Sequence, residues 1–134
     1  MLDPTTRILV VDDVPLMRRL TCSFLSKMGI KDVREAKDGK AALEALRQAL
    51  ADLVISDWNM PEMSGIELLR EIRSDAALKG IPLLLMTATD DKGDINEAMK
   101  CGISDYIAKP FDSKSLEAKI RTVLTESQYP GKTT

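Results

Sequence analysis

Short apolar runs alternate with amphipathic segments along most of the chain. Runs rich in β-branched and aliphatic residues predict five strands, namely RILVV from Arg7, DVREA from Asp32, DLVIS from Asp52, IPLLLM from Ile81 and SDYIA from Ser104. Helical spacing between them gives three apolar stripes: Leu16, Leu20, Phe24 and Met28; Ala42, Leu43, Leu46 and Leu50; Ile66, Leu69 and Ile72. A thinner stripe of Ile95, Ala98 and Met99 predicts a fourth helix, and Leu116, Ile120, Val123 and Leu124 predict a fifth.

Strict alternation of strands and helices predicts a doubly wound α/β fold, with a parallel sheet between two layers of helices. The runs ILVV and LVI are continuously apolar, which is typical of central strands covered on both faces, whereas the more polar DVREA fits an edge. We expect one domain over residues 1–128 and a disordered tail over residues 129–134.

Composition narrows the classes of function. The 134 residues carry 19 basic and 21 acidic side chains, which disfavours nucleic-acid binding. Cys22 and Cys101 have neither metal-site nor disulfide spacing, and no segment has the length and hydropathy of a membrane span or signal peptide. We therefore expect a cytoplasmic protein with free thiols and no membrane insertion. Because the chain has no histidine, its chemistry must use carboxylates, hydroxyls and lysine.

Polar residues follow four of the five predicted strands. Asp12 and Asp13 follow the first, Asp57 the third, Thr87 the fourth and Lys109 the fifth. Ligands of open α/β sheets bind at the carboxyl ends of the strands, so these side chains are expected to converge. Three converging carboxylates repel one another unless a cation lies among them or a pKa rises.

Oxygen ligands without histidine favour a hard ion such as Mg²⁺. Lys109 and Thr87 would then suit the oxygens of a phosphoryl group, and Asp57 is the candidate nucleophile because its strand is central. Taken singly, each residue has a simpler interpretation: Asp13 as a helix N-cap, Asp57 as a turn residue, Thr87 as a helix cap and Lys109 as a solvated loop lysine. Their joint appearance at strand ends favours the functional interpretation.

Other side chains fit structural roles. Trp58 is expected to be half-buried packing beside the polar site. Arg18 and Arg19 most simply form the solvated face of the first helix.

The chain resembles the receiver domain of two-component response regulators over nearly all its length, in RILVVDD, VISDWNMPEMSGIELL, LLLMTA and YIAKPF. Within that family, the acidic pair before LMRRL, the run ISDWNMP and Tyr106 two residues before AKPF are similar to CheY-type stand-alone chemotaxis regulators. The resemblance implies a flavodoxin-like receiver fold with five helices and strand order 2-1-3-4-5. It implies a monomer that is chiefly a signalling switch, although it catalyses its own phosphorylation and dephosphorylation.

The resemblance also implies roles for individual residues. Asp57 would accept a phosphoryl group from a phosphohistidine on a sensor histidine kinase, and Lys109 and Thr87 would hold its oxygens. Asp13, Asp57 and the backbone carbonyl of Asn59 would bind Mg²⁺ directly, with Asp12 acting largely through water. Asn59 and Thr89 would influence the lifetime of the phosphoryl group.

A bistable packing change is implied as well, in which Thr87 moves toward the phosphoryl group and Tyr106 rotates inward. A flagellar motor switch protein would bind the surface that this packing change alters, and a phosphatase would be a further partner. The candidate residues of this partner face are Lys92, Ile95, Met99, Tyr106 and Lys119. The sequence departs from the motor regulators at Thr89 and at the acidic pair Asp90 and Asp91. An alternative therefore remains, a stand-alone receiver that relays phosphoryl groups or regulates another enzyme.

Two rival classes fit less well. A phosphatase of the haloacid dehalogenase type needs a second aspartate two residues after its nucleophile, but Pro15 follows Asp13 at that distance and Asn59 follows Asp57. A flavodoxin-like binding module cradles phosphate in the loop after its first strand, where this chain has the acidic sequence DDVPLM.

Overall fold

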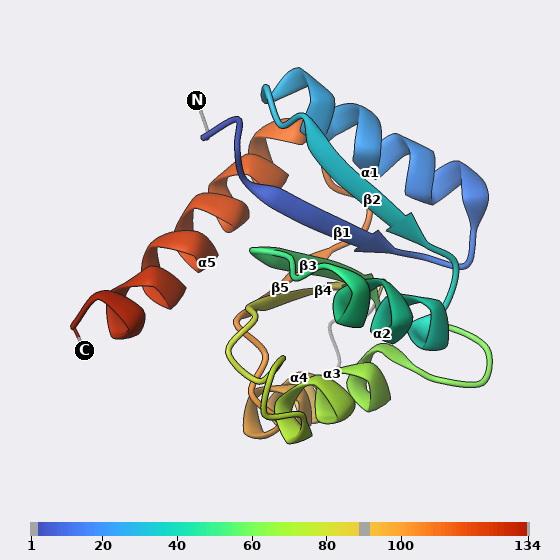
Figure 1. Ribbon diagram of the computed structural model, residues 1–134. Coiled ribbons are helices and arrows are strands. Elements are labelled where there is room, and N and C mark those ends of the chain that lie inside the picture. The colour runs from blue at the N-terminus through green and yellow to red at the C-terminus, as the bar shows by residue number, and fades with distance from the viewer. Residues whose placement is uncertain (1–2, 89–91, 134) are drawn as a thin grey trace.

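The computed structural model describes residues 3–88 and 92–133, which fold into a sheet between two layers of helices (Figure 1). The strands are β1 (Arg7–Val11), β2 (Asp32–Ala36), β3 (Leu53–Asp57), β4 (Leu83–Thr87) and β5 (Asp105–Ala108). The helices are α1 (Pro15–Lys27), α2 (Gly39–Gln48), α3 (Gly65–Ser74), α4 (Lys92–Lys100) and α5 (Ser113–Thr133). All neighbouring strands are parallel, in the order β2-β1-β3-β4-β5, which confirms the predicted fold.

The strand boundaries differ slightly from the prediction. β3 begins one residue later than predicted and includes Asp57, so that this aspartate is part of the sheet. The backbone of α5 continues to Thr133, through residues assigned to a disordered tail, so the domain boundary at residue 128 stays a prediction. None of the helices among the described residues is both long and apolar enough to span a membrane.

Two apolar cores lie on opposite faces of the sheet, because successive residues of a strand point to opposite sides. Ile8 and Val10 of β1 pack in the core formed with α1 and α5, whereas Leu9 and Val11 pack in the core formed with α2 and α3. β3 and β4 are buried along their whole length. The central strands are therefore fixed from both faces, and only their ends are available for polar chemistry.

The predicted apolar stripe of α1 is wrong at its first two positions and correct at its last two. Leu16 and Leu20 are 75% and 43% exposed, whereas Met28 is buried and Phe24 packs against the same core. Thr21 and Leu25 are buried although they were not part of the stripe, so helical spacing alone does not determine which positions face the sheet. The Thr21 hydroxyl donates to the carbonyl of Met17 at 3.1 Å, which satisfies this polar group inside the core.

The start of α3 lies directly against the end of β3. Gly65 donates its backbone N–H to the carbonyl of Trp58 at 2.8 Å. A β-carbon at position 65 would meet the carbonyl oxygen of Asp57 and would lie 2.7 Å from Leu85 Cδ2. Glycine is therefore required here for helix and strand end to approach, and this contact holds the segment that follows Asp57.

Candidate functional site

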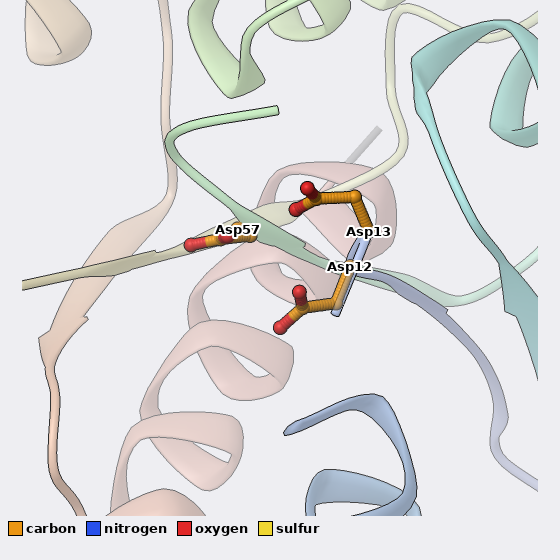
Figure 2. A group of neighbouring side chains, drawn as sticks. All are labelled: Asp12, Asp13 and Asp57. Carbon is orange, nitrogen blue, oxygen red and sulfur yellow. The ribbon is translucent and has the colours of Figure 1, made fainter. Parts of the chain in front are cut away.

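Three carboxylates gather at the carboxyl edge of the sheet. Asp12 and Asp13 directly follow β1, and Asp57 is the last residue of β3. One oxygen from each lies within 4.8 Å of the others, and Figure 2 shows the three side chains extending to the same side of the strand ends. Asp12 is 0% and Asp57 8% exposed. The convergence predicted from the strand ends is therefore present in the structure.

Backbone groups hold two of these carboxylates in place. The N–H of Val14 donates to Asp12 Oδ1 at 2.9 Å, and the N–H of Trp58 donates to Asp57 Oδ1 at 2.9 Å. The N–H of Asp12 itself donates to the carbonyl of Ala36, at the end of β2, at 3.1 Å. The N-cap residue of α1 is Val14, and no described side chain donates or accepts a capping hydrogen bond there. The interpretation of Asp13 as the N-cap is therefore wrong.

Lys109 is the cation nearest to the cluster among the described residues. Its ammonium donates to Asp57 Oδ1 at 2.8 Å and lies 3.8 Å from Asp12 Oδ2. Its backbone N–H donates to the carbonyl of Thr87 at 2.7 Å, which fixes the loop after β5 to the end of β4. The side chain is only 17% exposed, so the interpretation of Lys109 as a solvated loop lysine is wrong.

Two buried oxygens of the cluster have no hydrogen-bond partner among the described residues, Asp12 Oδ2 and Asp13 Oδ1. Burial raises the pKa of Asp12, the Val14 N–H opposes that rise, the charge of Asp57 adds to it, and Lys109 lowers it again. Carboxylate oxygens that are buried, close together and without a hydrogen bond from the described residues fit a hard divalent cation such as Mg²⁺. The donor set therefore agrees with the ion expected from the sequence.

The remaining candidates for chemistry have different surroundings. Thr87 is the last residue of β4 and is fully buried. Asn59 is exposed two residues after Asp57. Thr89, Asp90 and Asp91 lie outside the described residues.

The candidate partner face is only partly exposed. Met99 is 62% exposed, but Ile95 is 9% exposed, so we correct its assignment: its side chain packs into the domain. The side chain of Lys92 lies outside the described ones. Lys119 holds its ammonium 5.4 Å from the ring centroid of Tyr106.

Asp105 also belongs to this region. The Lys119 ammonium lies 3.3 Å from both carboxylate oxygens of Asp105, which precedes Tyr106 in β5. An ion pair and a cation–π contact thus restrain the same lysine.

Arg18 was missed as a residue of the site. Its Nη1 donates to the carbonyl of Asp12 at 2.6 Å and its Nε to Glu35 Oε1 at 2.9 Å, and the side chain is only 19% exposed. The predicted solvated face is therefore wrong for Arg18 and confirmed for the exposed Arg19. The sequence feature that could have indicated this role of Arg18 is Glu35, an acidic residue on the predicted edge strand beside β1.

Replacing Asp12 with asparagine is predicted to stabilise the metal-free protein at neutral pH. Because the folded-state pKa of Asp12 is raised, the folded protein holds this proton more tightly than the unfolded chain does, and ionised Asp12 destabilises the fold. That destabilisation grows as the pH rises from the usual value of 3.8 and is complete above the folded-state pKa. In EDTA at pH 7, Asp12→Asn should melt a few degrees higher than the wild type, and the gain should shrink as the pH falls toward 3.8.

Thermal unfolding followed by circular dichroism measures this effect. Asp32→Asn, at an exposed position of β2, is the matched control and should leave the pH dependence unchanged. A lower melting temperature for Asp12→Asn than for the wild type at pH 7 would contradict the electrostatic account.

Comparison with known proteins agrees with this geometry. Residues 8–121 match the response regulator receiver domain family. The chemotaxis protein CheY-3 of Vibrio cholerae is 42% identical over 119 residues, which cover 89% of this chain and 92% of the relative. The chemotaxis protein CheY1 of Helicobacter pylori is 43% identical over 120 residues, covering 88% and 96%.

A solved structure has the same architecture. The structure of the Vibrio cholerae chemotaxis protein CheY4 superposes with a TM-score of 0.84 at 30% identity, covering 89% of this chain and 98% of that one. The chain belongs to the response regulator receiver domain family, and its relatives include CheY-like chemotaxis proteins.

Proposed function

We propose that the protein is a phosphorylation-activated, single-domain response regulator whose Asp57 accepts a phosphoryl group from a sensor histidine kinase. The observation that carries this proposal is the state of Asp57, a buried carboxylate at the end of the central strand with Lys109 on one oxygen and two further carboxylates beside it. A structural aspartate would not need two acidic neighbours whose buried oxygens lack a hydrogen bond from any described residue.

The two oxygens of Asp57 differ in their surroundings. Oδ1 accepts from both Lys109 Nζ and the Trp58 N–H. Within residues 3–88 and 92–133 no hydrogen bond involves Oδ2, so this oxygen keeps its lone pairs for attack on phosphorus. In the proposed transfer a bond forms between Oδ2 and phosphorus while the P–N bond of the phosphohistidine breaks. The departing imidazole keeps the electron pair and takes a proton from water.

The residues of the cluster fit a Mg²⁺ ion. Asp13, Asp57 and the backbone carbonyl of Asn59 would hold it directly, and Asp12 through water. When bound, Mg²⁺ supplies positive charge that neutralises the phosphoryl oxygens. Lys109, which lies 2.8 Å from Asp57, would bind one of these oxygens, and the Thr87 hydroxyl would donate to another. Asn59 and Thr89 would tune hydrolysis by flanking the path of the attacking water.

The proposed output is a change at the partner face. Thr87 would move toward the phosphoryl group and Tyr106 would rotate inward, which would alter the surface around Met99 and Lys119. The relatives that are named chemotaxis proteins support a flagellar motor switch protein as the partner. We place this activity in the cytoplasm, a compartment that suits the free thiols of Cys22 and Cys101.

Acetyl phosphate, a small phosphoryl donor, provides the direct test. Incubation with Mg²⁺ should add the mass of one phosphoryl group to the wild type, measured by intact-protein mass spectrometry. Asp57→Asn should gain nothing, while the control Asp32→Asn should behave as the wild type because Asp32 is exposed on the edge strand. The proposal fails if Asp57→Asn is modified to the same extent, or if the wild type acquires no adduct.

A synthetic peptide from a flagellar motor switch protein tests the proposed partner. Phosphorylated protein should bind it roughly 5- to 150-fold more tightly than unmodified protein, the usual range of coupling between two sites. Fluorescence anisotropy of the labelled peptide measures the affinity, and Asp57→Asn treated with acetyl phosphate serves as the control. Equal affinity before and after phosphorylation would instead favour a receiver that relays phosphoryl groups or regulates another enzyme.

A further inference from the structure

The side chain of Arg18 connects the acidic cluster to the edge strand of the sheet. From α1 it reaches the carbonyl oxygen of Asp12 with Nη1, at 2.6 Å, and the carboxylate of Glu35 on β2 with Nε, at 2.9 Å. The guanidinium is largely buried, whereas Glu35 is 46% exposed. Hydrogen bonds that involve a charged group are shorter and stronger than neutral ones, so this bridge is a firm connection.

Both backbone polar groups of Asp12 are thereby fixed to β2. Its N–H donates directly to the carbonyl of Ala36, and its carbonyl is fixed to Glu35 through Arg18. That carbonyl belongs to the peptide unit that joins Asp12 to Asp13. The orientation of this unit sets the direction in which the Asp13 side chain leaves the backbone, and α1 begins only two residues later.

Asp13 depends on this constraint more than its neighbours do. Asp12 and Asp57 each accept a hydrogen bond from a backbone N–H, whereas buried Asp13 Oδ1 has no hydrogen-bond partner among the described residues. The position of the Asp13 carboxylate is therefore set by its backbone. Arg18 fixes that backbone without itself touching the three carboxylate groups.

We propose that Arg18 is a positioning residue that sets the affinity of the acidic cluster for Mg²⁺ by holding the peptide between Asp12 and Asp13. This inference rests on the proposed function, because it concerns the same cation site. Groups that orient metal ligands from outside the coordination sphere commonly change metal affinity by about 10- to 100-fold when they are removed.

The charge of Arg18 makes the sign of the effect diagnostic. A guanidinium near a cation site repels the cation, so its charge alone predicts that Arg18→Ala would bind Mg²⁺ more tightly. The positioning role predicts weaker binding. A general loss of packing would lower the melting temperature without weakening Mg²⁺ binding by the molecules that remain folded.

Mg²⁺ titration followed by Trp58 fluorescence distinguishes these cases, at a temperature where circular dichroism shows every variant to be folded. Arg18→Ala should bind Mg²⁺ at least about tenfold more weakly than the wild type. Arg18→Lys should be intermediate, because one ammonium cannot reproduce the fork that reaches both acceptors. Arg19→Ala removes the same charge from an exposed position of the same helix and should leave the affinity close to that of the wild type.

Equal or tighter Mg²⁺ binding by Arg18→Ala would overturn the inference, as would an equal loss in Arg19→Ala. If Arg18→Ala does not fold, Arg18→Lys and Glu35→Ala take its place, and unchanged affinity in both would overturn the inference equally. A wild type that binds no Mg²⁺ would overturn the proposed function together with this inference. If the wild type binds Mg²⁺ and the Arg18 variants bind it with the same affinity, only this inference is overturned.

Discussion

The repulsion among three carboxylates, two of which contact the same lysine, is the constraint on which the rest of the site depends. The pairing of β1 with β3 opposes Val11 to Ser56, so the next residues of the two strands, Asp12 and Asp57, come together at the same edge. Lys109 reaches both of them but carries one positive charge against three negative ones. The cluster is therefore left with excess negative charge in a buried place, the condition that favours a divalent cation.

The remainder of the fold holds this unfavourable arrangement in place. Two apolar cores, one on each face, fix the central strands and supply the stability that the charged edge lacks. Local contacts then set the geometry: Gly65 lets α3 approach the end of β3, and Arg18 fixes the peptide after Asp12. A site that costs stability and is supported by its surroundings is typical of functional positions in proteins.

The sequence predicted the fold and the convergence of the cluster for one reason: strand ends can be located from apolar runs, and parallel strands end at one edge. The sequence-based prediction failed where it had to say which way a side chain of a helix points. Leu16 and Leu20 were predicted to share a buried stripe with Phe24 and Met28, but they face solvent, because helical spacing alone does not reveal which positions the sheet covers. Arg18 was misjudged for the same reason, since its acceptors, the Asp12 carbonyl and Glu35, are neighbours only in three dimensions. Ile95, which was predicted to lie on the partner face, is buried for the same reason.

The most direct test of the central claim is the dependence of the melting temperature on Mg²⁺, compared between the wild type and Asp13→Asn at constant ionic strength. If the carboxylates repel and a cation relieves them, the wild type should melt at a temperature that rises steadily with the Mg²⁺ concentration, as for any ligand that binds only the folded state. Asp13→Asn should melt higher than the wild type in EDTA and respond little to Mg²⁺. A wild type indifferent to Mg²⁺, or an equal response in both proteins, would contradict the account.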